Sequence, residues 1–130
     1  MSETEPRWLT VEQVKVIHER QLARFGGPGG IRDEGALESA LMRPVYRRQY
    51  GASDLADLSA AYAYRLARSH PFVDGNKRAA FTTMMLFLRR NGTRFSPDQG
   101  QATAMFLALA AGEVDENGLT RWIRDNWPSA

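Results

Sequence analysis

Apolar residues recur at helical spacing along most of the chain, and no segment shows the strict alternation of apolar and polar residues that a half-buried strand requires. The first helix is predicted to begin after Thr10, because Thr10 and Gln13 have the spacing of a capping box, and to end at Gly26. Its periodic positions are Val11, Val14, Ile17, His18, Leu22 and Phe25.

A second helix is predicted after Asp33, which is placed to cap it. We expect this helix to end before Pro44, because proline disfavours helical backbone in the residue that precedes it, and residues 43–53 to form a connector. The connector is basic and aromatic, a mixture that can face a partner, but we interpret it as solvated arginines with tyrosines on the surface. These residues are Arg43, Tyr46, Arg47, Arg48 and Tyr50.

Four further helices are predicted in the rest of the chain. One begins near Ser53 or Asp54 and runs to His70, and the segment 76–90 is apolar on nearly all sides, which is typical of a helix in the middle of a bundle. Another is predicted to have Ser96 as its cap and to stop at Gly112, and the last ends at Pro128. The pattern predicts an all-α single domain over residues 1–130, with about six helices around a buried central helix and with tails at 1–8 and 128–130.

Length and composition narrow the possible functions. A chain of 130 residues has room for one hydrophobic core, and the absence of cysteine excludes disulfides, cysteine-based zinc sites and thiol chemistry. The longest apolar run, residues 104–111, is far shorter than the roughly 20 residues of a membrane helix. We therefore expect a cytoplasmic protein without a membrane association.

The net charge is only +2, from 17 basic and 15 acidic residues. Proteins that wrap duplex nucleic acid neutralise several phosphates and show a stronger basic bias. We therefore do not expect direct nucleic-acid binding, and a local anion site fits the charge better.

The segment most informative about chemistry is residues 70–78, His-Pro-Phe-Val-Asp-Gly-Asn-Lys-Arg, which leads into the apolar helix. Lys77 and Arg78 fall in the first turn, where the helix dipole makes a cation unfavourable by roughly 0.3–1 kcal/mol. A bound anion reverses this, because the free N–H groups, a flexible Gly75, the Asn76 amide and both cations then point at it. Phosphate is the natural candidate.

Two further groups complete a site for phosphoryl or nucleotidyl transfer. Asp74 offers one carboxylate, which suits Mg²⁺ held mainly by phosphate oxygens and water. His70 can take a proton from an attacking hydroxyl at neutral pH, and Phe72 is predicted to anchor the loop in the core. Each residue alone has an ordinary structural interpretation, but together within nine residues they favour function. His18 has no such companions, and we interpret it as helix surface or core edge.

These residues resemble the Fic/Doc superfamily, and within it the Doc branch of bacterial toxin–antitoxin modules. The motif is His-x-Phe-x-Asp-x-Asn-Lys-Arg, and the similarity continues at residues 24–27, 32–35, 86–92 and 111–113, so that it covers nearly the whole chain. The resemblance implies a Fic fold and a kinase that transfers the γ-phosphate of ATP to a threonine of elongation factor Tu.

The resemblance also implies roles for the motif residues. His70 is the general base, Asp74 the Mg²⁺ ligand, and Gly75, Asn76, Lys77 and Arg78 form the phosphate-binding group. A Phd-type antitoxin is implied as partner, with a C-terminal segment that folds into a groove on the toxin.

Lys77 separates the two reactions of the superfamily. Members that transfer AMP have Gly at this position and a second Arg where this chain has Phe81, so the resemblance favours γ-phosphate transfer. Pro71 and Gly75 follow the AMP-transferring form, and AMP transfer is therefore the second candidate reaction. Two functions without catalysis also stay open. One is a ribosome- or RNA-binding growth inhibitor, and the other is an inactive homologue kept as an interaction module.

Overall fold

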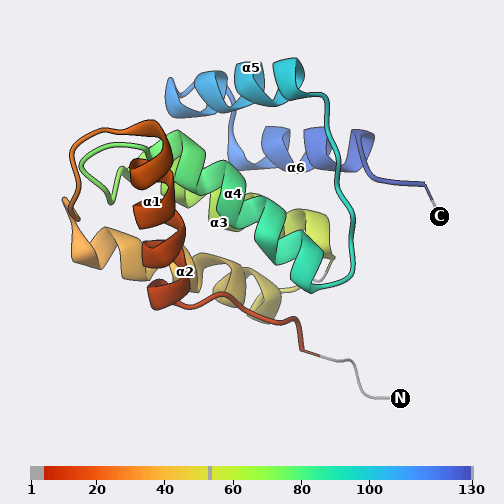
Figure 1. The fold of residues 1–130 in the computed structure, drawn as a ribbon. Coiled ribbons are helices and arrows are strands. Elements are labelled where there is room, and N and C mark those ends of the chain that lie inside the picture. Colours follow the sequence, from red (N-terminus) through yellow and green to blue (C-terminus); the bar gives the residue numbers. More distant parts are fainter. Residues whose placement is uncertain (1–4, 53, 130) are drawn as a thin grey trace.

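A computed structural model describes residues 5–52 and 54–129, and these residues form six helices and no strand (Figure 1). The all-α class and the number of helices are thus as predicted. The helices are α1 (Val11–Phe25), α2 (Glu34–Gln49), α3 (Leu55–Ser69), α4 (Asn76–Arg90), α5 (Gln99–Ala110) and α6 (Glu116–Asp125).

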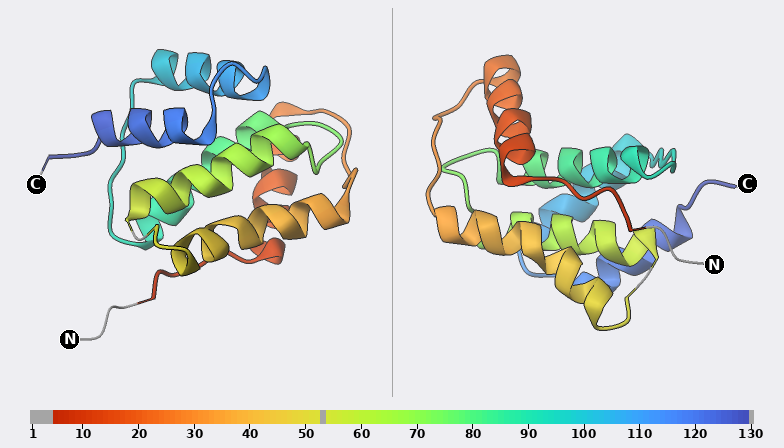
Figure 2. Two further views of the ribbon diagram at one scale, coloured as in Figure 1. Left: turned by 180° about the vertical axis from the view of Figure 1, so that it is seen from behind. Right: turned by 90° about the horizontal axis from the view of Figure 1, so that it is seen from below.

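The hairpin of α3 and α4 forms the middle of the domain (Figures 1 and 2). Helix α2 packs on α3, α1 runs across α4 and α2, and α5 and α6 cover the remaining side. The segment 76–90, predicted to lie at the centre, is α4 and packs along α3; α3 itself contacts α2, α4, α5 and α6. Alanines at positions 60, 61, 63 and 67 of α3 are fully buried, which allows this close packing.

Most helix boundaries follow the predicted caps. The capping box of Thr10 and Gln13 is present, and Gly26 ends α1 with a positive φ of 79°. Asp33 caps α2 by accepting from the Ala36 N–H, and Asp54 caps α3. Ser53, the other candidate for this cap, lies outside the described residues.

The predicted end of the second helix before Pro44 is wrong, because α2 continues through Pro44 to Gln49. Proline inside a helix removes one backbone hydrogen bond and costs about 3 kcal/mol. Ion pairs that need the helical spacing oppose this cost: Arg43 and Arg47 reach Glu116 of α6, and Arg47 also reaches Asp57 of α3. The expected connector is therefore mostly helix, and its arginines are paired rather than simply solvated.

The predicted cap of the fifth helix is also wrong. Asp98, not Ser96, caps α5 by accepting from the Gln101 N–H at 3.0 Å, so the helix begins two residues later than a Pro97 start would give. Both residues are good caps, and an aspartate carboxylate is a strong acceptor for the first N–H groups of a helix.

The segment before α1 lies along the α3–α4 hairpin. Trp8 stacks on Phe87 with ring centroids 5.9 Å apart, and the Asn91 side chain exchanges two hydrogen bonds with the Arg7 backbone. Leu9 donates its backbone N–H to the buried Tyr62 hydroxyl at 3.0 Å. No helix among the described residues is long and apolar enough to span a bilayer.

The buried Tyr62 hydroxyl should make the free energy of unfolding depend on pH in the alkaline range. Burial raises the pKa of Tyr62 to about 12, against an ordinary value of 10.0. As pH rises through this interval the unfolded chain loses the proton first, so the free energy of unfolding falls, by about 1 kcal/mol at pH 11. Urea unfolding at pH 8 to 11 should show this loss in the wild type and in the exposed-site control Tyr50→Phe, but not in Tyr62→Phe. Parallel pH profiles for all three proteins would contradict the assignment.

Candidate active site

The loop that joins α3 to α4 is held against the segment before α2. The backbone N–H groups of Arg32 and Asp33 both donate to the Pro71 carbonyl, at 2.7 and 3.0 Å, and Val73 donates to the Gly30 carbonyl at 3.1 Å. Ile31 and Phe72 thus form one antiparallel bridge. The loop therefore has a fixed backbone although His70, Val73 and Asp74 are exposed.

His70 sits at the first position of this loop in a strained conformation. Its φ is 48°, and it is the sole non-glycine residue with a positive φ in the described chain. Such a conformation costs a non-glycine residue about 1–2 kcal/mol. The Arg32 guanidinium offsets this cost: Nε donates to the His70 carbonyl at 2.6 Å, and Nη2 donates to the Ser69 carbonyl at 2.7 Å. The His70 side chain is exposed.

Phe72 and Asn76 close the other half of the loop. Phe72 is buried, as predicted, and its backbone exchanges two hydrogen bonds with the Asn76 side chain, N–H to Oδ1 at 2.9 Å and Nδ2 to the carbonyl at 3.0 Å. Asn76 therefore shapes the loop, a role that the sequence did not indicate. One N–H of its Nδ2 is left over for another acceptor.

Helix α4 begins without a side-chain cap. Gly75 occupies the N-cap position with φ 79°, whereas the other five helices of the described chain each have a Thr or Asp cap. Lys77 and Arg78 follow in the first turn, both exposed, and neither forms an ion pair with a described carboxylate. The start of α4 thus offers free N–H groups and two cations to an anion.

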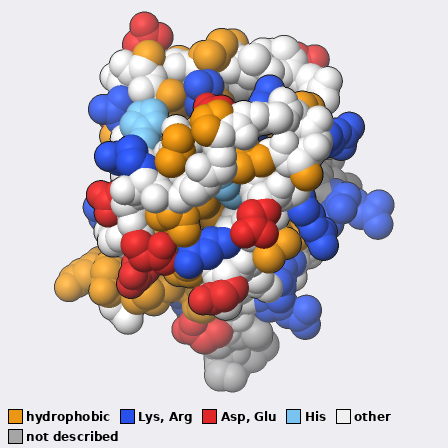
Figure 3. Space-filling model, turned by 60° about the vertical axis from the view of Figure 1, so that its left-hand side comes forward, with side chains coloured by type: hydrophobic (Ala, Val, Ile, Leu, Met, Phe, Trp, Pro, Cys, Tyr) orange, Lys and Arg blue, Asp and Glu red, His pale blue; other side chains and the backbone are white. Residues whose placement is uncertain are grey.

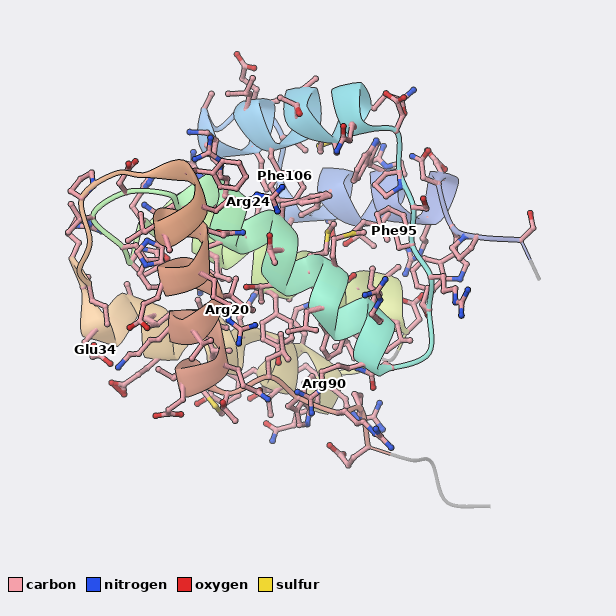
Figure 4. The ribbon with its side chains drawn as sticks, in the orientation of Figure 1. Arg20, Arg24, Glu34, Arg90, Phe95 and Phe106 are labelled. Carbon is pink, nitrogen blue, oxygen red and sulfur yellow. The ribbon has the colours of Figure 1, made fainter. Side chains whose placement is uncertain are left out.

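A cleft of about 1000 Å³ opens over this helix start. All six residues predicted from the motif line it: His70, Asp74, Gly75, Asn76, Lys77 and Arg78. Its other walls come from the second half of α1, from α4 and from α5. They combine the apolar residues Phe25, Phe81, Phe106 and Leu107 with the polar residues Gln21, Thr82, Gln99 and Thr103. Phe106, on α5, and Arg24, near the end of α1, are labelled in Figure 4.

Aromatic contacts shape two of these walls. Phe81 meets Phe106 edge to face at 5.4 Å, and the Arg78 guanidinium lies 4.4 Å from the Phe25 ring centroid. An arginine over an aromatic face is attracted by the ring quadrupole and stays charged. Arg78 is therefore kept at the edge of the cleft with its N–H donors facing no described carboxylate.

His18 is the residue that the sequence interpretation missed. It is buried, its ring stacks on Phe72 at 3.8 Å, and its Nε2 lies 2.6 Å from the Asp74 carbonyl oxygen. The two residues are 56 positions apart, so spacing along the chain gives no signal of this contact. His18 therefore contacts two residues of the motif loop, Phe72 and Asp74.

Asp74 is the carboxylate best placed for a metal. No group of three or more His, Cys, Asp or Glu residues that could hold a metal ion occurs in the part of the chain that is described. Asp74 lines the cleft beside the cationic start of α4, and one carboxylate with phosphate oxygens and water is a common Mg²⁺ environment. The residues present fit a Mg²⁺–phosphate complex.

Charge is mixed on the face shown in Figure 3, where basic and acidic side chains are interspersed with apolar ones. A broad basic track of the kind that follows a nucleic-acid backbone is not visible on this face. The local cationic site at the start of α4 is therefore the feature to explain.

Comparison with known proteins gives a match to the Fic/DOC family over residues 8–88. The chain belongs to the Fic/DOC family. It is 33% identical over 125 residues to "Protein kinase doc" of Escherichia phage P1, a match that covers 95% of this chain and 98% of that protein. It is also 42% identical over 77 residues to "Toxin Doc" of Mycolicibacterium smegmatis, covering 57% and 58% of the two chains. The predicted resemblance is confirmed, and the motif lies within the matched Fic/DOC region.

The Arg32 clamp can be tested by substitution. Arg32→Gln removes the charge-assisted bonds to the Ser69 and His70 carbonyls, and we expect about 1–3 kcal/mol less stability in urea unfolding. Arg32→Lys should recover part of this, because lysine keeps the charge but not the two-donor geometry. Asp33→Ala is not a suitable control because Asp33 caps α2, so exposed Arg121→Gln serves instead. Equal stabilities for Arg32→Gln and Arg121→Gln would contradict the clamp.

Proposed function

We propose that this Fic/DOC protein is the toxin of a type II toxin–antitoxin module and a protein kinase. In this proposal it transfers the γ-phosphate of ATP to a threonine of elongation factor Tu and thereby arrests translation. The observation that supports it best is the uncapped, doubly cationic start of α4, which lies in one cleft with an exposed histidine and a carboxylate. The relative named a protein kinase, which aligns over nearly the whole chain, supports the same reaction.

Each motif residue has a distinct role in the proposed reaction. The N–H groups at the start of α4, with Lys77 and Arg78, bind and neutralise the phosphates, and Gly75 and Asn76 shape that surface. Asp74 is the residue that would hold Mg²⁺, and the ion would supply positive charge beside the phosphate oxygens. His70 takes the proton of the threonine hydroxyl as its oxygen bonds to the γ-phosphorus, and the bond from that phosphorus to the β–γ bridging oxygen breaks.

Two positions favour γ-phosphate over AMP transfer. The Lys77 side chain takes space at the cleft that a glycine would leave free, and it adds a charge there. Phe81 packs on Phe106 where AMP-transferring members have a second arginine. AMP transfer is the second candidate, because Pro71 and Gly75 follow the form of the motif in enzymes that carry it out.

The proposed function also implies a partner protein and a cellular location. The relative named a toxin supports an antitoxin partner, which we infer to be of the Phd type with a C-terminal segment that binds a groove of this protein. A cytoplasmic location follows from the proposed target. Action as an RNA-binding inhibitor is disfavoured because Arg43 and Arg47, two arginines that suggested it, are paired with carboxylates.

The position of a radioactive label separates the two reactions. Purified protein is incubated with elongation factor Tu, Mg²⁺ and ATP labelled at either the α- or the γ-phosphate. Label from the γ-position should appear on the elongation factor, and His70→Ala should reduce its rate by about 10²–10⁴-fold. Transfer of the α-label would contradict the kinase assignment, and transfer of neither label would contradict both reactions.

Two exposed cations on α4 form a matched pair for the phosphate site. Lys77 lies at the cleft, and Arg90 lies at the opposite end of the same helix (Figure 4). Lys77→Ala removes a charge-assisted bond to phosphate and should raise the KM for ATP about 10-fold or more. Arg90→Ala should leave KM unchanged. The same KM for both variants would exclude Lys77 from phosphate binding.

A further inference from the structure

We propose that α1 and the turn that follows it position the Asp74 carboxylate, with His18 and Gly27 as positioning residues. The inference rests on the proposed role of Asp74 as the Mg²⁺ ligand. Asp74 lies in an exposed part of the loop next to Gly75, whose φ of 79° shows an open turn rather than a regular helix. The local backbone of the loop therefore does not fix the direction of the Asp74 side chain.

His18 fixes the backbone of Asp74. Its Nε2 lies 2.6 Å from the Asp74 carbonyl oxygen, and because a carbonyl can only accept, Nε2 carries the proton. The ring is held in place on its face by Phe72, which lies parallel within 9° at a centroid distance of 3.8 Å. The Phe72 backbone is hydrogen-bonded to the Asn76 side chain, so the His18 ring packs against a loop whose own conformation is fixed.

Gly27 limits where the Asp74 carboxylate can lie. A methyl group at Gly27 would lie 2.6 Å from Asp74 Oδ2, closer than non-bonded atoms approach, so the carboxylate occupies space that only glycine leaves free. The neighbouring Gly26 also has a positive φ, of 79° against 113° at Gly27, but a methyl group there would meet nothing within 4 Å. The two glycines therefore differ in their relation to Asp74 and not in the sign of φ.

These contacts matter because Mg²⁺ demands near-octahedral geometry and tolerates little displacement of its ligands. Groups that orient a metal ligand without touching the metal typically change metal affinity or activity by about 10–100-fold when mutated. His18 from the middle of α1 and Gly27 from the turn after it act on the carbonyl and on the carboxylate of the same residue. Their joint effect is to set the direction in which Asp74 faces the cleft.

The first test measures ATP affinity by calorimetry with and without Mg²⁺, which needs no catalytic turnover. The ratio of the ATP affinity with Mg²⁺ to the ATP affinity without Mg²⁺ reports the contribution of the metal ligand. Asp74→Asn, which removes that ligand, gives the lowest ratio expected. His18→Phe keeps a ring on Phe72 but removes the donor, and it should shift the ratio about 10-fold toward that limit. His18→Gln, whose amide nitrogen can reach the same carbonyl, should restore the wild-type ratio.

Two controls separate positioning from loss of stability. Val14→Ala affects another buried residue of α1 and should lower the melting temperature without changing the ratio. Gly27→Ala should shift the ratio about as far as His18→Phe, whereas Gly26→Ala should not. The glycine pair keeps the proposal testable if His18→Phe fails to fold.

The outcomes that would overturn the proposal are specific. A ratio in His18→Phe equal to that of Val14→Ala, or one in Gly27→Ala equal to that of Gly26→Ala, would show that these residues do not act on Asp74. A wild-type ratio in Asp74→Asn would remove the metal role itself and the inference with it. Wild-type protein that binds Mg²⁺ and ATP with the expected ratios but transfers no phosphate would contradict the proposed function alone.

Discussion

Two hydrogen bonds between the Asn76 side chain and the Phe72 backbone are the constraint on which the site depends. They close the loop between α3 and α4 tightly enough for Phe72 to enter the core while Val73 and Asp74, which follow it, stay at the surface. The N-cap position of α4 is Gly75, with φ 79°, so this helix lacks the side-chain cap that the other described helices possess. The loop is thereby shaped so that the N–H groups of α4 face a cleft rather than a protein carboxylate.

The rest of the molecule supports this arrangement from several directions. The segment before α2 pairs with the loop and supplies Arg32, which donates hydrogen bonds to the Ser69 and His70 carbonyls and holds His70 in a left-handed conformation. Helix α1 supports the loop from the core side through His18. A histidine, a carboxylate and two cations from one short segment are in this way held by groups from distant parts of the chain.

Much of this could be predicted from the sequence, because it depends on local patterns. Helices α1, α2 and α3 begin at the predicted caps Thr10, Asp33 and Asp54, and α4 spans the predicted residues 76–90. The functional motif is also local, since His70, Asp74 and Lys77 are neighbours in the sequence as in space. By contrast, the helix through Pro44 could not be predicted, because ion pairs from α2 to α3 and α6 oppose the preference of the proline. The role of His18 was hidden for the same reason, since its partners lie more than 50 positions away.

The most direct test of the account is a crystal structure of the protein with Mg²⁺ and a non-hydrolysable ATP analogue. We expect the γ-phosphate to lie at the start of α4, within hydrogen-bond distance of Lys77 or Arg78. Mg²⁺ should be bound by Asp74, and the His70 imidazole should face the γ-phosphorus across the cleft. A nucleotide bound elsewhere, or a carboxylate of the protein itself occupying the start of α4, would contradict it.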